Sequence, residues 1–429
     1  MIRPVTRTGL SQRAWRLLES PPFAEYIQEH IARLGSVYDA EANPGGYIPL
    51  SVAENLLSGD LLLERMAAVR DVPATVLSYG PMVGSLEFRE QLARFLGRAV
   101  FGRRFPPEQL AVLAGAGAVL EVVFHNLCDP RDGVLVPTPS YAGFWPDLET
   151  RDELVILPVH TRSSEGFRLT PAALDRAVAE ARRPVKALLF TSPNNPLGTV
   201  YAAEDVEEIL SWAESAGIHV VFDEIYALSV FGDRPFTSCA RLRNRLGDSV
   251  HIIWAFSKDF GASGLRCGVL VSENQDLLKA VDALAQWTCV SGHTQYLLGE
   301  AVSDEAWVDS YVEDVRATLG TAYQTVTAAL EDHAIPYLPA AAGFFLLCDL
   351  RQYLPEPSWQ AEHALWRRLL EEANVNLTPG QACHNAEPGF LRLCFAAMPT
   401  DAVVTGVRRL GKVLGRINEV RRSLDSDDS

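Results

Sequence analysis

Short apolar runs alternate with helical patterns through the middle of the chain. Apolar residues at helical spacing predict helices over Glu87–Leu96 and from Val119 onward. Between the helical stretches lie apolar runs of strand length, at Leu110–Leu113, Gly133–Pro137, Val185–Thr191, Ile218–Phe222, His251–Ala255 and Cys267–Ser272. Strands that alternate with helices indicate an α/β fold with a mostly parallel sheet covered on both faces.

The two ends of the chain differ from this middle part. Residues 10–34 have the pattern of an amphipathic helical arm, and residues 35–60, rich in Gly, Pro and Asn, are expected to be irregular. After residue 310 the pattern indicates a smaller α+β domain, with helices near 310–333 and 358–374 and strands near 343–350 and 390–395. We therefore predict an N-terminal segment that contributes to the small domain, a large domain and a small C-terminal domain, over residues 1–60, 61–309 and 310–429.

Composition narrows the class of protein. The chain has 429 residues, of which 48% are hydrophobic and 21% charged, enough apolar material for well-filled cores. Its formal net charge of −16 gives no general attraction for nucleic acid or for an anionic membrane, so neither is expected as a partner. An anionic ligand must therefore be held by specifically placed groups.

Seven cysteines are spread along the chain, and no Cys-x-x-Cys pair occurs among them. This favours free thiols in a reducing compartment over disulfides or a zinc site, and no metal site is predicted. Residues 1–9 lack the apolar segment of a signal peptide, and no apolar run approaches the length of about 18 residues that spans a bilayer. These features predict a cytoplasmic protein.

Polar side chains come directly after three of the apolar runs. Asn195 follows one run, Asp223 and Tyr226 follow the next, and Lys258 follows a third. In parallel sheets ligands bind at the carboxyl ends of the strands, so these residues are expected to meet at one site.

Lys258 is the candidate for covalent attachment of pyridoxal 5′-phosphate (PLP). It lies in Trp254-Ala-Phe-Ser-Lys-Asp-Phe-Gly-Ala-Ser-Gly-Leu-Arg-Cys-Gly268, after an apolar strand, where partial burial lowers the pKa of an amine and favours a Schiff base. Ser257 precedes it, and Arg266 lies between glycines that permit close backbone approach, as a cofactor phosphate requires. A solvated lysine is the ordinary alternative, but these spacings favour the cofactor.

Asp223, Tyr226 and Asn195 match the remaining demands of PLP. A carboxylate must keep the pyridine nitrogen protonated, and Asp223 fits that role, although an acid at a strand end is often only a helix cap. Tyr226 suits the phenolic oxygen of the ring. Asn195, in Ser192-Pro-Asn-Asn-Pro-Leu-Gly-Thr199, could bond the same oxygen or the substrate, although this is also a good turn sequence.

Ala116 and Gly117 join a predicted strand to a predicted helix. Their segment, Ala114-Gly-Ala-Gly-Ala118, could form a phosphate cup at a helix N-terminus. A dinucleotide-binding loop is the alternative, but its third glycine is replaced by Leu120. Tyr141, in Pro137-Thr-Pro-Ser-Tyr-Ala-Gly-Phe144, is positioned to stack on the pyridine ring, with an ordinary half-buried tyrosine as the alternative.

Arg392 lies inside the apolar stretch Glu387-Pro-Gly-Phe-Leu-Arg-Leu-Cys-Phe395. Burying an arginine without a partner is very costly, so a substrate α-carboxylate is the natural partner. An internal Asp or Glu is the alternative.

Together these motifs resemble class I/II enzymes of the aspartate-aminotransferase superfamily, and most closely 1-aminocyclopropane-1-carboxylate (ACC) synthases and ACC-synthase-like enzymes. The resemblance spans about residues 20–412 and includes Asn43-Pro-Gly-Gly-Tyr-Ile48, Ala53-Glu-Asn55, Asn195-Pro-Leu-Gly-Thr199, Ser257-Lys-Asp-Phe-Gly261 and Glu387–Ala396. It implies PLP fold type I, with a mostly parallel seven-stranded sheet in the large domain. It also implies a homodimer with shared active sites, in which Glu54 lies near the substrate and Tyr79 reaches the cofactor phosphate of the partner subunit.

This chain departs from ACC synthases at the substrate side. They typically read Ser-Pro-Tyr-Phe near the start, where this chain has Ser20-Pro-Pro-Phe23, and Tyr-His-Gly where it has Met82-Val-Gly84. Ala255 replaces a serine that bonds the phosphate. The cofactor residues are kept while the substrate wall has changed, which favours a relative with altered chemistry.

Three functions follow from this resemblance. In the first, Cα deprotonation is followed by loss of a Cγ leaving group, as from S-adenosylmethionine, by γ-elimination, cyclisation or γ-substitution in specialised metabolism. In the second, the enzyme is an aminotransferase that makes a 2-oxo acid. Glu54 and its neighbours favour the first. The third, a non-catalytic sensor joined to a DNA-binding domain, is disfavoured because the chain is acidic and has no room for a winged helix.

Overall fold

The computed structural model describes residues 9–427, with side chains through residue 419. Its main sheet is made of β2 (Leu110–Leu113), β3 (Gly133–Thr138), β4 (Val155–His160), β5 (Val185–Thr191), β6 (His219–Asp223), β7 (Val250–Ala255) and β8 (Gly268–Ser272). These seven strands lie in the order β2-β8-β7-β6-β5-β3-β4. β8 is antiparallel to both neighbours and the other pairs are parallel, which confirms the predicted mostly parallel sheet.

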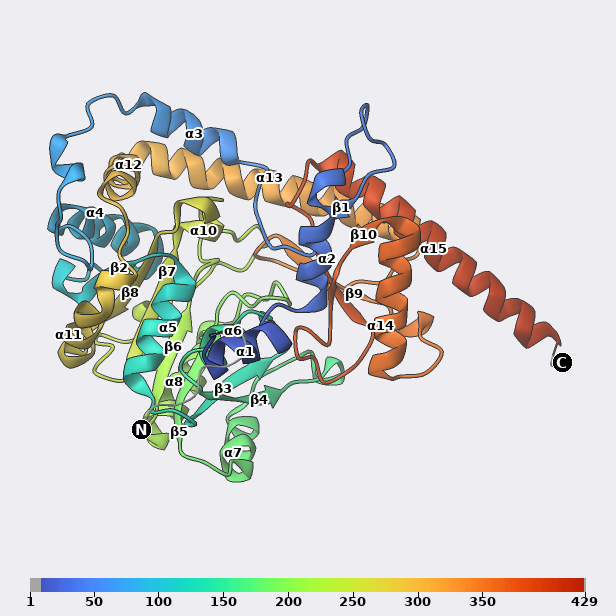
Figure 1. Ribbon diagram of the computed structural model, residues 1–429, viewed down its shortest axis with the longest axis horizontal. Coiled ribbons are helices and arrows are strands. Elements are labelled where there is room, and N and C mark those ends of the chain that lie inside the picture. Colours follow the sequence, from blue (N-terminus) through green and yellow to red (C-terminus); the bar gives the residue numbers. More distant parts are fainter. Residues whose placement is uncertain (1–8, 428–429) are drawn as a thin grey trace.

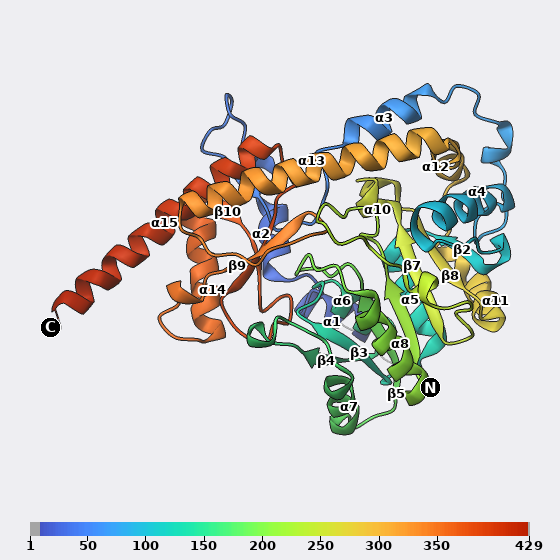
Figure 2. The same ribbon diagram turned by 180° about the vertical axis from the view of Figure 1, so that it is seen from behind.

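Helices cover both faces of this sheet, as Figures 1 and 2 show from opposite sides. Successive strand residues point to opposite faces. Leu189 of β5 therefore packs in one apolar cluster with residues of α5 (Ala116–Leu127) and α11 (Gln275–Leu284). Its neighbours Leu188 and Phe190 pack in the other cluster, with residues of α8 (Ala203–Ala216). Because both faces are buried, the strands read as continuous apolar runs.

The other α-helices of this part of the chain have between 4 and 12 residues. They are α3 (Gly59–Ala68), α4 (Leu86–Leu96), α6 (Phe144–Glu149), α7 (Pro171–Glu180), α9 (Cys239–Leu242), α10 (Phe256–Asp259) and α12 (Gly292–Ser303).

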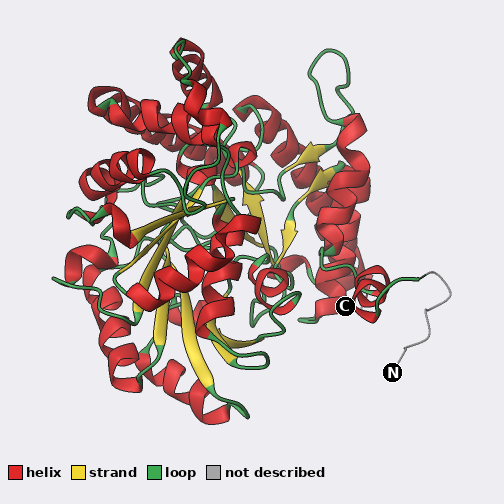
Figure 3. Ribbon diagram, turned by 60° about the vertical axis from the view of Figure 1, so that its left-hand side comes forward, coloured by secondary structure: helices red, strands yellow, loops and turns green. Residues whose placement is uncertain are grey.

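The C-terminal domain is built on a separate antiparallel sheet, visible as isolated yellow strands in Figure 3. This sheet consists of β11 (Thr378–Pro379), β12 (Phe390–Cys394) and β9 (Phe345–Asp349), in that order. Its helices are α13 (Glu305–Asp332), α14 (Trp359–Arg368) and α15 (Thr400–Asp427). The boundary predicted at residues 309/310 falls inside α13, and the division into three parts stays a prediction.

The N-terminal segment reaches the C-terminal domain. β1 (Ile48–Pro49) pairs in parallel with β10 (Val375–Asn376). The predicted helical arm is interrupted, since α1 (Gln12–Glu19) and α2 (Glu25–Arg33) are separate helices. The Pro21-Pro22 pair between them lacks the amide hydrogens that a continuous helix needs.

Within the described part of the chain, no helix combines the length and the apolar character needed to cross a bilayer. The predicted absence of a signal peptide concerns residues 1–9, which lie almost wholly outside the described residues.

Candidate active site

A cavity of about 220 Å³ opens at the carboxyl ends of β5, β6 and β7. Parallel strands end at the same edge of a sheet, so residues that follow them in sequence meet there. The predicted residues that line this cavity are Ala116, Gly117, Tyr141, Asn195, Asp223, Tyr226, Ser257, Lys258 and Arg266.

Lys258 lies in α10, the short helix that follows β7 directly. Its Nζ donates a hydrogen bond of 2.6 Å to the backbone carbonyl of Ala53. Burial, together with the nearby positive charge of Arg392, lowers the pKa of the amine to about 8. A lysine with this pKa has a much larger neutral fraction at physiological pH than an ordinary lysine, and the neutral amine is the form that attacks an aldehyde.

Asp223 is the last residue of β6 and is 6% exposed. It accepts a hydrogen bond of 3.3 Å from the Ile225 amide, and none of the described side chains forms an ion pair with it. Burial raises the pKa of its carboxyl group to about 7. A cationic ring nitrogen beside Asp223 would favour the ionised carboxylate and offset the cost of its burial.

Asn195 connects Tyr226 to Arg392. Its Nδ2 donates to the Tyr226 hydroxyl at 3.2 Å, and its Oδ1 accepts from Arg392 Nη1 at 2.9 Å. All three side chains are 2% exposed. A residue predicted to bind the cofactor ring and a residue predicted to bind the substrate therefore share one amide.

Arg392 is buried without a carboxylate partner in the described structure. Its Nη2 donates to the Ser51 carbonyl at 2.5 Å and to Thr378 Oγ1 at 3.0 Å, and its Nε has no partner. The alternative of an internal Asp or Glu is therefore wrong, since the acceptors are neutral oxygens. A buried guanidinium with neutral partners still carries its full charge, which is the environment that attracts a ligand carboxylate.

The N-terminus of α5 faces the guanidinium of Arg266. Gly115, the residue before the helix, has φ 90°, and a Cβ there would lie 2.5 Å from Arg266 Nη2. Arg266 donates to the carbonyls of Ser263 and Ala114, at 3.1 and 3.3 Å. The amides of the first helical turn and the guanidinium thus converge at the edge of the cavity, as an oxyanion such as phosphate requires.

Of three further predicted residues, Tyr141 lines the cavity, Glu54 lies beside it and Tyr79 lies away from it. Tyr141 is 37% exposed and packs edge-on against Phe144, with ring centroids 5.3 Å apart. Glu54 accepts a hydrogen bond of 2.7 Å from the hydroxyl of Ser263, which lines the cavity. Tyr79 is 97% exposed and lines a different cavity, beside α12, so a single chain does not bring it to Lys258.

Three polar lining residues were missed from the sequence: Asp147, Thr191 and Ser263. Burial and the charge of Glu121 raise the pKa of the Asp147 carboxyl group to about 6. The Oγ1 of Thr191 is buried and has no hydrogen-bond partner. Thr191 ends an apolar strand beside Asp223, so its position carried the same signal that identified the predicted residues.

The comparisons with known proteins agree with this arrangement. The model of the family described as aminotransferase class I and II matches residues 46–410. ACC synthase 4 of Oryza sativa subsp. japonica is 36% identical over 416 residues, covering 88% of this chain and 84% of that protein. ACC synthase 7 of Arabidopsis thaliana is 35% identical over 399 residues, covering 88% and 89%.

Solved structures show the same fold at lower identity. The aspartate aminotransferase of Thermus thermophilus with maleate has a TM-score of 0.78 and 23% identity, covering 94% of this chain and 99% of that one. The aromatic aminotransferase of Pyrococcus horikoshii has a TM-score of 0.75 and 24% identity, covering 86% and 96%. These likenesses establish an aspartate-aminotransferase-like fold for this chain.

Proposed function

Because this chain belongs to the family of class I and II aminotransferases, and within it is similar to ACC synthases, we propose that it removes the Cα proton of S-adenosylmethionine and releases the sulfonium group from Cγ. It is a PLP-dependent lyase or transferase. The observation that carries the proposal is the contact of Lys258 with the Ala53-Glu54-Asn55 segment: Lys258 Nζ donates to the Ala53 carbonyl, and Glu54 bonds Ser263 at the rim of the same cavity.

The residues of the cavity fit PLP. The amine of Lys258 has a lowered pKa, and Asp223 forms no ion pair with any described side chain. The amides of α5 and the guanidinium of Arg266 suit the phosphate, and the unpartnered hydroxyl of Thr191 offers a further polar contact. When bound, the cofactor supplies an electron sink for the charge left at Cα.

The protein side chains then have separate tasks in this proposal. Arg392 binds the α-carboxylate, and Asn195 fixes the positions of Arg392 and Tyr226 relative to each other through its two hydrogen bonds. Lys258 Nζ takes the Cα proton, because its lowered pKa lets it act as a base near neutral pH. Glu54 carries negative charge beside the cavity and favours a substrate with a cationic sulfonium.

We extend the proposal to a homodimer in the cytoplasm, in which Tyr79 completes the partner's cavity. The near-complete exposure of Tyr79 supports this, as do other large apolar side chains that are more than half exposed: Leu63, Leu77 and Trp287. Exposed apolar surface of this kind is typical of a protein interface. All seven cysteines are free, which suits a reducing compartment.

Transamination is the second candidate. The match to the model of the family described as aminotransferase class I and II supports it. The two functions use the same proton removal from Cα and differ in what happens at Cγ.

The discriminating experiment is incubation of the holoenzyme with S-adenosylmethionine. Release of methylthioadenosine supports the proposal, and its amino-acid co-product reveals whether elimination, cyclisation or substitution occurred. Formation of 2-oxo acids from several amino donors, with no methylthioadenosine, would instead assign the chain to transamination. The Glu54→Gln variant is the matched comparison, since it removes the charge but keeps an acceptor for Ser263.

A further inference from the structure

Between the main sheet and the strand that carries Arg392, three contacts follow one another in sequence order. Glu387 contacts Ser163, Phe390 packs against Phe167 and Leu197, and Arg392 bonds Asn195. The first contact consists of hydrogen bonds to a carboxylate, the second is apolar, and the third is a hydrogen bond from a guanidinium. They form a seam, residues 387–392 against residues 163–167 and 195–197, that joins the C-terminal domain to the main sheet.

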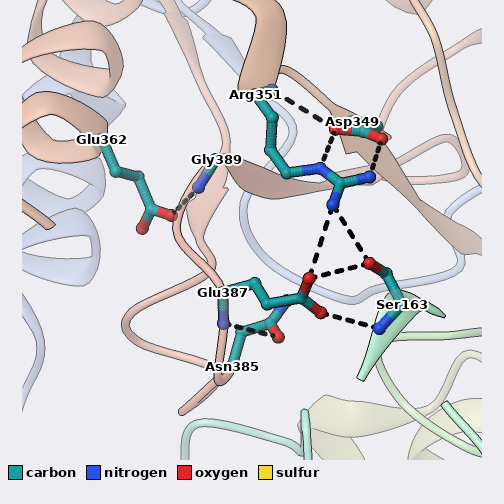
Figure 4. Close-up of polar contacts among 7 residues, drawn as sticks. All are labelled: Ser163, Asp349, Arg351, Glu362, Asn385, Glu387 and Gly389. Atoms are coloured by element: carbon teal, nitrogen blue, oxygen red, sulfur yellow. Dashed lines mark hydrogen bonds and ion pairs between the residues drawn. The ribbon is translucent and has the colours of Figure 1, made fainter. Parts of the chain in front are cut away.

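Glu387 forms the outer end of this seam, and Figure 4 shows its contacts. Its carboxylate accepts from the Ser163 amide at 2.7 Å and from the Ser163 hydroxyl at 2.8 Å. Arg351 donates from Nη1 to the Ser163 hydroxyl at 3.0 Å and lies 3.4 Å from Glu387 Oε1. Asp349 holds this guanidinium from the other side, with bonds of 2.8 Å to Nε and 2.7 Å to Nη2.

The chain between Glu387 and Arg392 has little freedom to absorb a movement. The φ of Pro388 is fixed by its ring. Gly389 has φ 101°, and its amide donates to Glu362 at 2.6 Å while its carbonyl accepts from the Leu350 amide at 2.7 Å. A displacement of Glu387 is therefore transmitted to β12 and to the guanidinium of Arg392.

We propose that Glu387 is a positioning residue, which latches the C-terminal domain to Ser163 and so holds Arg392 where it receives the carboxylate of the substrate. The inference rests on the proposed role of Arg392 as the carboxylate-binding residue. It does not depend on which bond of the substrate breaks.

Two reagents test this without a known substrate. Aminooxyacetate and methoxyamine both react with PLP in the holoenzyme: the reagent nitrogen forms a C=N bond with the cofactor's aldehyde carbon, and the Lys258 amine is released. Aminooxyacetate carries a carboxylate and methoxyamine does not. The ratio of their second-order rate constants, followed by the change in visible absorbance, therefore reports how well Arg392 holds a carboxylate.

The Glu387→Ala variant is expected to lower this ratio about tenfold, because a displaced guanidinium no longer meets the carboxylate. The rate with methoxyamine should stay unchanged. Glu387→Gln should restore part of the ratio, since its amide oxygen can still accept from Ser163. Glu372→Gln is the matched control: Glu372 also contacts two arginines, Arg368 and Arg416, but only within the C-terminal domain.

An unchanged ratio in folded Glu387→Ala holoenzyme would overturn the inference. An equal slowing of both reagents would overturn it too, since the effect would then be a general disturbance of the fold. Ser163→Ala provides a second variant should Glu387→Ala fail to fold, and it must lower the ratio in the same direction. This assay contains no S-adenosylmethionine. Its result therefore stands even if the separate incubation with S-adenosylmethionine releases no methylthioadenosine.

Discussion

The two walls of the cavity are built in different ways. The cofactor wall comprises the Gly115–Gly117 turn, Asp223, Lys258 and Arg266, all at strand ends of the main sheet. The proposed substrate wall meets the cavity lining at Asn195. It joins residues that are distant in sequence: Ser51 of the N-terminal segment, Asn195 of the main sheet, and Thr378 and Arg392 of the C-terminal domain. One wall is therefore fixed by a single sheet, whereas the other depends on how the domains meet.

The electrostatics of the two walls differ as well. On the cofactor wall, burial shifts two pKa values toward neutrality, that of Asp223 upward and that of Lys258 downward. Groups with shifted pKa values are suited to proton transfer. On the substrate wall, Arg392 stays charged among neutral acceptors. In the proposed function, the cofactor wall therefore serves the chemistry and the substrate wall serves recognition.

The largest effect is expected for Lys258→Ala. It removes both the attachment point of the cofactor and the proposed base, so turnover should fall by at least about 10⁴-fold. The visible absorbance of the lysine-linked cofactor should disappear, which spectroscopy of the purified variant measures directly. Lys279→Ala is the control, because Lys279 is exposed on α11 and pairs only with Asp276. Persistence of the absorbance in Lys258→Ala would mean that another residue carries the cofactor.

The difference between the walls also explains what the sequence could predict. Each residue of the proposed cofactor wall sits in a local motif next to the end of an apolar strand, and these motifs identified it. Two of the three acceptors of Arg392, at Ser51 and Asn195, are 341 and 197 residues away in sequence, and no local pattern encodes such a contact. Its buried position was predictable, whereas its neutral partners were not.

The fold shows the same distinction. The central strands β5, β6 and β7 are continuous apolar runs and were recognised. β4 was missed because Pro158 and His160 interrupt its apolar pattern, which is tolerated because β4 lies at the edge of the sheet. The interruption of the N-terminal arm at Pro21-Pro22 could have been predicted from proline chemistry alone.

An intermediate effect is expected for Arg392→Lys, which alters only the substrate wall. A guanidinium can bond Asn195 and a carboxylate at the same time because its geometry is two-pronged. A lysine ammonium lacks this geometry. Loss of the hydrogen bonds to the charged group should lower kcat/KM by about 100-fold. The absorbance of the bound cofactor should remain, since the cofactor wall is intact.

Arg409→Lys is the control for that variant, because Arg409 also donates to backbone carbonyls, at Gly46 and Pro44, but lies outside the cavity. Loss of cofactor absorbance in Arg392→Lys would show that the two walls are not separable. An unaltered kcat/KM would show that another group receives the carboxylate.

The smallest effect is expected for the electrostatic interaction between the two walls, in which the charge of Arg392 acts on Lys258. It should appear in the pH dependence of cofactor loading. Lys258 attacks the aldehyde as the neutral amine, so the rate at which the apoprotein binds PLP should rise about tenfold per pH unit and level off above about pH 8, the lowered pKa of Lys258. The charge of Arg392 contributes to that lowering. In Arg392→Gln the pKa of Lys258 should therefore rise, and loading near neutral pH should slow by about threefold while the plateau moves to higher pH. Stopped-flow measurement of absorbance across pH 6.5–9.5 follows both changes, and an unmoved profile in Arg392→Gln would mean that burial alone sets the pKa of Lys258.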